Sequence, residues 1–242
     1  MSAAPPPNRF GDHTNVLFEA FIFSFTVLPI LVLIYFYSQL PERIPEYLNL
    51  HGDVEVWGRK SLASVFRLPL MAVDMQMLCL LTKYGLWQGA VARPVQAAET
   101  LTIQSLKLSS RLWDWFRALI AFKLGASSLE VIFLTNDRLH SLATAMRTIS
   151  WAAAILGVIG FGFYVYRLIP VNRKLRQMSA GYELSGRNQS THLRAAIFYY
   201  NPSDPSLFVK KYGLNFANKW AYVFLTCLVC LPLLMFLPML NS

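Results

Sequence analysis

The chain of 242 residues is 55% hydrophobic and only 14% charged, whereas soluble domains contain about 25% charged residues. This composition points to a membrane protein. The net charge of +9 is explained by basic loops beside membrane spans and by anionic headgroups, so we expect no nucleic-acid partner.

Five apolar runs have the length of about 20 residues that a helix needs to cross a hydrocarbon core. The sequence therefore predicts an all-α fold, a polytopic membrane bundle of five transmembrane helices. These spans are 16–38, 62–84, 112–135, 148–169 and 218–238. Residues 1–15 are polar and Pro-rich and do not resemble a cleaved signal peptide, so we expect a cytoplasmic tail.

The distribution of Lys and Arg predicts the orientation of these spans. With the N-terminus in the cytoplasm, fourteen Lys and Arg fall on the cytoplasmic side and five on the outer side, as the positive-inside rule requires. The C-terminus is then outside, with an outer loop at 39–61 and a cytoplasmic segment at 170–217. Residues 93–111 are expected to form a helix along the inner surface that leads into the third span.

Two of the spans contain charged residues, which are costly in a bilayer unless they are paired or reach water. Arg67 and Asp74 are seven residues apart, as are Lys123 and Glu130, so each pair shares one helix face. Because the spans run antiparallel, we predict an ion-pair ladder of Arg67 with Glu130 and Asp74 with Lys123. The ladder would fix helix register; the alternative is a polar pathway for an ion or small solute.

Further residues within the spans are expected to take part in helix contacts. Glu19 and Gln76 belong to the same polar set, and Arg117 is predicted to pair with Asp114, one turn away, or with Glu19, at similar depth. The fourth span carries a small-residue face that permits close helix contact. Its members are Ala153, Gly157 and Gly160.

Motifs of catalysis are missing from the sequence. It contains no nucleotide-binding loop, zinc-protease motif or nucleophile elbow. His51, Asp53 and Glu55 would share a face if extended, but we expect a solvated loop rather than a metal site, and Cys227 and Cys230 are expected to be packing residues. We therefore predict no enzyme activity, no metal and no cofactor.

Two polar motifs interrupt the apolar pattern. The first motif, residues 40–61, is LPERIPEYLNLHGDVEVWGRKS. It resembles the signature LPxxIPxHxNxxGxxDxWGxK of a bacterial polytopic membrane family of largely unknown function, which includes SdpI-type immunity and signalling proteins. The matching residues include Pro41, Ile44, Pro45, Asn49, Gly52, Trp57, Gly58 and Lys60. Tyr47 stands where the family often has His, and Glu55 where it often has Asp.

The second motif, residues 198–218, is FYYNPSDPSLFVKKYGLNFAN. It resembles the companion module NPxDPRLFVPKRxG of the same family. The matching residues include Asn201, Pro202, Asp204, Pro205, Phe208, Gly213, Asn215 and Phe216. The resemblance implies a multi-pass protein of the bacterial cytoplasmic membrane.

Three classes of function follow from these observations, and one of them, a membrane enzyme, has no catalytic motif in the sequence to support it. The first is a non-catalytic integral membrane protein that recognises or stabilises a protein partner, either as an accessory subunit of a membrane complex or as an immunity or signalling component. The alternative is a small ion or solute transporter that uses the charges of the second and third spans. We expect membrane lipids and a membrane protein as partners. Both motifs are expected to form rigid surface elements for docking or anchoring, or simply to cap the spans.

Overall fold

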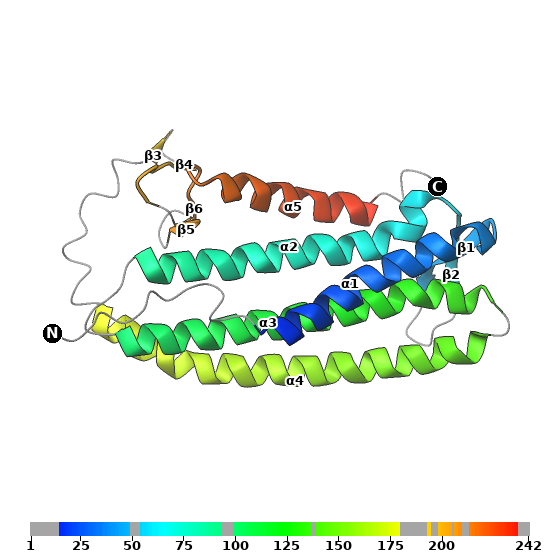
Figure 1. The fold of residues 1–242 in the computed structure, drawn as a ribbon, viewed down its shortest axis with the longest axis horizontal. Coiled ribbons are helices and arrows are strands. Elements are labelled where there is room, and N and C mark those ends of the chain that lie inside the picture. The colour runs from blue at the N-terminus through cyan, green and yellow to red at the C-terminus, as the bar shows by residue number, and fades with distance from the viewer. Residues whose placement is uncertain are drawn as a thin grey trace. The chain divides into compact units, whose positions relative to one another are not determined.

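The computed structural model describes residues 15–48, 54–92, 99–136, 139–179, 193–194, 198–204, 206–209 and 213–236. The described chain is mostly helical, which confirms the predicted helical fold (Figure 1). Its five α-helices are α1 (Val16–Phe36), α2 (Leu62–Ala92), α3 (Glu99–Leu134), α4 (His140–Ser179) and α5 (Lys219–Phe236).

Three stretches of these helices are long and apolar enough to cross a membrane. They are Val16–Gln39, Leu62–Gln88 and Ser141–Leu175, and α5 contributes a shorter apolar stretch, Lys219–Leu231. Helix α3 is not among the three; the predicted span within it carries four charged residues. The structure thus supports membrane-spanning helices in α1, α2 and α4 by length and composition.

The helices extend beyond the apolar runs from which they were predicted. Helix α2 continues to Ala92, and α4 continues to Ser179. The helix predicted at 93–111 to lead into the third span is, from Glu99 on, the first part of α3, which runs unbroken to Leu134. Residues 93–98 lie outside the described residues. Hydropathy marks only the apolar part of such a helix, because polar residues with good helix propensity continue the same hydrogen-bond pattern.

The chain divides into two compact units. The first, which we call the hairpin unit, comprises Val16–Leu78, Trp115–Gly160 and Thr226–Ser242. The second, which we call the NPSDP unit after its second motif, comprises Met1–Asn15, Cys79–Asp114 and Phe161–Leu225.

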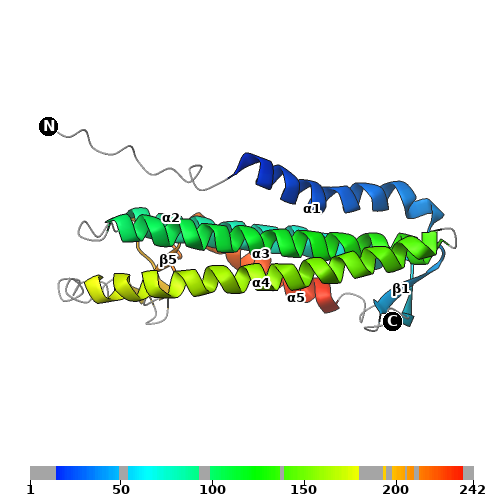
Figure 2. The ribbon, with the colours of Figure 1, turned by 90° about the horizontal axis from the view of Figure 1, so that it is seen from below.

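The hairpin unit contains an antiparallel β-hairpin that follows α1. Strands β1 (Arg43–Leu48) and β2 (Val54–Arg59) pair with Ile44 opposite Gly58, and the register shifts after Pro45. Figure 2 shows the hairpin at the end of α1, near the connection of α3 to α4. A buried apolar cluster joins it to the helices: Leu33, Leu40, Ile44, Val65 and Ile132. The sequence predicted only a loop here, because prolines within a run of residues normally argue against a β-strand.

Glycines bring the helices of the hairpin unit into close contact. A Cβ atom on Gly125 of α3 would lie 2.6 Å from the Phe25 carbonyl oxygen of α1. One on Gly157 of α4 would lie 2.6 Å from Cδ1 of Leu119. Gly157 belongs to the small-residue face predicted for the fourth span, and its contact with α3 confirms that this face allows close helix packing.

The NPSDP unit contains short strands before α5. Strand β3 (Leu193–Arg194) pairs with β4 (Phe198–Tyr199), and β5 (Phe208–Val209) pairs with β6 (Gly213–Leu214). A parallel bridge from Tyr199 to Asn215 connects the two pairs. Figure 1 shows these strands beside the first turns of α5.

We predict that Gly125→Ala destabilises the protein by about 1–3 kcal/mol, because its methyl group would displace the α1 backbone. Gly162→Ala is the matched control, since no atom lies within 4 Å of its Cβ position; it should be neutral or stabilising by up to about 1 kcal/mol through helix propensity. The free energy of unfolding in detergent micelles measures both. Equal effects of the two substitutions would contradict the close contact of α1 with α3.

Candidate functional site

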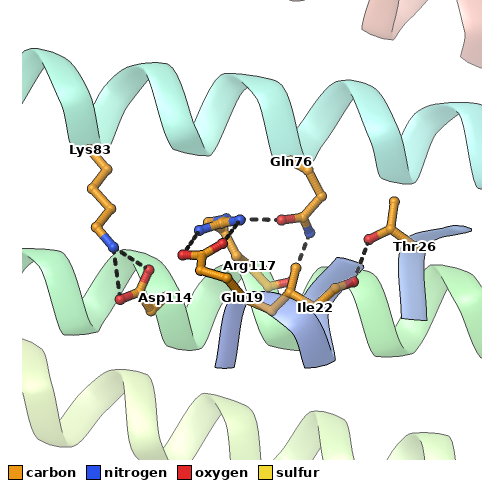
Figure 3. A network of polar contacts seen from close by, with 7 residues as sticks. All are labelled: Glu19, Ile22, Thr26, Gln76, Lys83, Asp114 and Arg117. Atoms are coloured by element: carbon orange, nitrogen blue, oxygen red, sulfur yellow. Dashed lines mark hydrogen bonds and ion pairs between the residues drawn. The ribbon is translucent and has the colours of Figure 1, made fainter. Parts of the chain in front are cut away.

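Three polar side chains from three helices meet inside the hairpin unit (Figure 3). Arg117 of α3 donates from Nη1 and Nη2 to the two carboxylate oxygens of Glu19 of α1, both at 2.8 Å. Its Nε donates to Oε1 of Gln76 of α2 at 3.0 Å. Gln76 Nε2 in turn donates to the Arg117 carbonyl oxygen at 2.9 Å. Four hydrogen bonds therefore link α1, α2 and α3.

The burial of this cluster is uneven. The Arg117 side chain is only 3% exposed, and that of Glu19 is 30% exposed. The bidentate contact with a carboxylate is a strong and directional geometry for a guanidinium, and Gln76 accepts from a third donor, the Nε–H. The predicted pairing of Arg117 with Glu19 is thus confirmed. Gln76 was predicted to join the polar set of the ladder, and it contacts Arg117 instead.

The alternative partner of Arg117, Asp114, pairs with another residue within the NPSDP unit. Lys83 Nζ of α2 donates to Oδ1 and Oδ2 of Asp114 at 2.8 and 3.0 Å (Figure 3). The side chains are 2% and 13% exposed. Sequence reasoning missed this pair, since it counted Lys83 among the basic residues of the cytoplasmic side. The long lysine side chain instead reaches inward along the helix pair.

The first rung of the predicted ladder does not form. Glu130 accepts a hydrogen bond from Nε of Arg147 of α4 at 2.6 Å, and Arg67 Nη2 donates to the carbonyl oxygen of Glu46 in the hairpin at 3.1 Å. The prediction that Arg67 pairs with Glu130 was therefore wrong. Residue spacing establishes which side chains share a helix face, but it does not say which neighbouring element that face meets.

The second rung is also missing among the described residues. Lys123 Nζ lies 4.3 Å from the centre of the Trp151 ring of α4, a cation–π contact. Asp74 faces the Cys227 thiol of α5, and its Oδ2 is buried without a hydrogen-bond partner in the described part of the chain. Helices α4 and α5 supply these contacts, which the comparison of only the second and third spans could not include.

The first motif forms a hairpin that is held on one side by contacts with the helices. Lys60 Nζ donates to the Leu40 carbonyl oxygen at 2.7 Å and lies 5.4 Å from the centre of the Tyr37 ring. Gly58 leaves room for the Glu46 side chain, which would overlap any Cβ at that position. Of the predicted motif residues, Ile44 and Pro45 are buried, Pro41 and Trp57 are exposed, and Asn49 and Gly52 lie outside the described residues.

The hairpin leads into α2 through a reciprocal cap. Ser61 Oγ accepts a hydrogen bond from the Ser64 backbone N–H at 3.0 Å, and Ser64 Oγ accepts one from the Ser61 N–H at 2.9 Å. This arrangement satisfies donors at the helix start that would otherwise lack partners. The orientation of the hairpin is therefore coupled to the first turn of α2.

Asn215 organises the second motif. Its side chain is fully buried, and Nδ2 donates to the carbonyl oxygens of Asn201 and Asp204 at 3.0 and 2.7 Å. Its Oδ1 accepts from the backbone N–H groups of Asn201 and Ala217, both at 3.1 Å. All four hydrogen-bonding positions of the amide are thus used, and they tie Asn201 and Asp204 to the chain at Asn215 and Ala217.

The other residues of the second motif support this loop. Asp204 Oδ1 accepts from the Ser206 N–H at 2.9 Å, as turn-forming Asp residues do. Phe208 meets Phe224 edge to face, with ring centres 5.3 Å apart, and the Phe216 N–H donates to the Tyr199 carbonyl oxygen. Pro202 is exposed, Gly213 lies in β6, and Pro205 lies outside the described residues.

In the ranges that the structure describes, no group of three or more His, Cys, Asp and Glu could hold a metal ion. His51 and Asp53 of the first motif lie outside those ranges. The polar clusters found here are ion pairs and amide hydrogen bonds between structural elements.

No family model matches this chain, and no curated protein or solved structure matches it either. The family resemblance of the two motifs remains a prediction from their residues.

We predict that Lys83→Gln destabilises the protein by about 3–5 kcal/mol, because it leaves the buried Asp114 carboxylate without its cation. Lys107→Gln is the matched control: it makes the same change at an exposed position of α3 and should alter stability by less than about 0.5 kcal/mol. Denaturant titration in micelles, followed by circular dichroism, measures both variants. Equal small effects would show that the Lys83–Asp114 pair contributes little.

Proposed function

We propose that this chain is a non-catalytic integral membrane protein that recognises a protein partner through its first motif. It would have five spans in the bacterial cytoplasmic membrane, with the N-terminus in the cytoplasm and the C-terminus outside. The partner would be a membrane complex to which the chain belongs as an accessory subunit, or a protein that it binds in immunity or signalling, as the resemblance to the SdpI-type family implies.

The observation that carries this proposal is the hairpin, which is fixed on one side and exposed on the other. Ile44 is 1% exposed, whereas Val56 and Trp57 on β2 are 45% and 51% exposed. Contacts of Lys60 and Arg67 with backbone carbonyl oxygens hold the strands to the helices. A rigid surface with an accessible aromatic residue loses little conformational entropy on binding, which suits recognition.

The orientation proposal is supported by charge. The connections assigned to the cytoplasm carry most of the Lys and Arg, which is the normal asymmetry of membrane proteins. In this orientation the hairpin would lie outside and the second motif would lie in the cytoplasm. Exposed apolar side chains on α1 and α4, such as Leu31, Ile34, Ile155 and Ile159, suit contact with lipid.

The transporter alternative has one observation in its favour, the buried Oδ2 of Asp74 that lacks a hydrogen-bond partner among the described residues. Unsatisfied carboxylates within membrane helices often mark ion pathways. The other carboxylates of the predicted spans, Glu19, Asp114 and Glu130, are each in an ion pair. A series of carboxylates free to bind a moving ion is therefore not supported, and recognition is the better proposal.

The test is recovery of the partner from native membranes. Tagged full-length protein, extracted in mild detergent, should retain one membrane protein in constant ratio, quantified by mass spectrometry. Trp57→Ala should reduce that recovery about tenfold, as expected for an interface anchor. Tyr35→Ala is the matched control, an exposed aromatic of the same unit on α1, and should not reduce it.

Two outcomes would contradict the proposal. The wild-type chain could be recovered alone, as a monomer and in full yield. Alternatively, Trp57→Ala and Tyr35→Ala could lower recovery equally, which would indicate a general loss of folded protein instead of a contact through the hairpin.

A further inference from the structure

Helix α4 is the least covered of the long apolar helices. Only 6% of the most apolar window of Ser141–Leu175 is buried, compared with 22% for Val16–Gln39 and 44% for Leu62–Gln88. Large apolar side chains are exposed along most of its length: Leu142, Ile149, Trp151, Ile155, Leu156, Val158, Ile159, Phe161, Phe163, Tyr166 and Ile169. Such a helix presents a long surface for acyl chains.

The apolar face ends in a group of exposed cations. Arg167, Arg173 and Lys174 are exposed, and none of them forms an ion pair within the part of the chain that the structure describes. Helix α4 itself contains no Asp or Glu. Arg167 and Lys174 are seven residues apart, so they lie on the same face of the helix.

Aromatic residues and a proline complete this group. The Arg167 guanidinium lies 5.7 Å from the centre of the Phe163 ring, and Tyr166 is 74% exposed. Pro170 lies inside α4 and has no N–H to donate to the Tyr166 carbonyl oxygen four residues earlier. Arg167 therefore directly follows a residue whose backbone carbonyl lacks its usual helix donor.

We infer that residues 163–174 of α4 form a binding site for the headgroup of an anionic phospholipid. The phosphate would lie between Arg167 and Lys174, while a headgroup hydroxyl could donate to the Tyr166 carbonyl oxygen. Guanidinium groups bind phosphate through paired hydrogen bonds.

The apolar surface identifies the occupant as a lipid. The cations continue directly from the exposed apolar face of the same helix, so a ligand with both a phosphate and acyl chains matches both parts. Soluble phosphate compounds or nucleic acids would leave the apolar part uncovered. The site rests on the membrane placement proposed above, but it does not depend on the protein partner.

The test uses full-length protein purified in mild detergent and titrated with phosphatidylglycerol or with phosphatidylcholine of the same chains, with bound lipid counted by native mass spectrometry. The wild type should bind phosphatidylglycerol roughly tenfold more tightly or better, the effect expected of two basic residues at a lipid surface. The double variant Arg167→Gln/Lys174→Gln should lose this preference. The control Arg43→Gln/Arg59→Gln removes two exposed cations from the hairpin and should keep it.

Three results would overturn the inference. The first is that the wild type binds phosphatidylglycerol and phosphatidylcholine equally well. The second is that both double variants lose the preference for phosphatidylglycerol to the same extent. The third is that inorganic phosphate displaces the bound lipid more than chloride does at the same ionic strength. Membrane fractionation of the same cells separates the two proposals. Protein that pellets with membranes but shows no preference contradicts only the lipid site, whereas protein absent from the membrane fraction contradicts the proposed function as well.

Discussion

A charged side chain among apolar helices must find an opposite charge or a hydrogen-bond partner, and this requirement shapes both units. Arg117 satisfies it with the Glu19 carboxylate of α1 and the Gln76 side-chain amide of α2. Lys83 satisfies it with Asp114, and Arg147 with Glu130. Each contact joins two different helices, so the cost of burying a charge is offset by an interaction that also determines helix neighbours.

The Arg117 cluster is especially important for α1. Helix α1 also packs against α3 through apolar side chains such as Phe25 and Phe122 and through the close approach of Phe25 to Gly125. Apolar contacts between helices have little orientational preference in a lipid environment, because lipid chains are equally apolar. The bidentate ion pair of Arg117 with Glu19 supplies that orientational preference. It aligns α1 with α2 and α3, and the hairpin that follows α1 is then held at the ends of the same helices.

The sequence was sufficient to predict features that depend on a single helix or on the depth of a side chain in the membrane. Runs of apolar residues located all five helices, and similar depth suggested Glu19 as the partner of Arg117. The ladder failed because Arg67, Asp74, Lys123 and Glu130 were compared only with one another. Their actual neighbours come from α4, α5 and the hairpin, whose placement depends on tertiary packing.

Other features were hidden by competing local signals. The hairpin has Pro41 just before its first strand and Pro45 within it, and prolines normally argue against a strand. The pairing of its two strands is evident only from the structure, in which the buried Ile44 lies opposite Gly58. The network around Asn215 likewise depends on residues 14 positions apart. Turn-forming pairs such as Asn201-Pro202 indicate that the chain turns there, but they do not identify the side chain that closes the loop.

The central claim, that Glu19 and Arg117 together hold α1 in place, is tested most directly by a double-mutant cycle. The free energies of unfolding of wild type, Glu19→Gln, Arg117→Gln and the double variant would be measured in the same micelles. We expect a coupling energy of roughly 1–3 kcal/mol, within the range found for contacting charged residues, with the double variant more stable than the sum of the single losses predicts. Additive effects, with coupling near zero, would show that the pair does not hold α1 and would contradict the account.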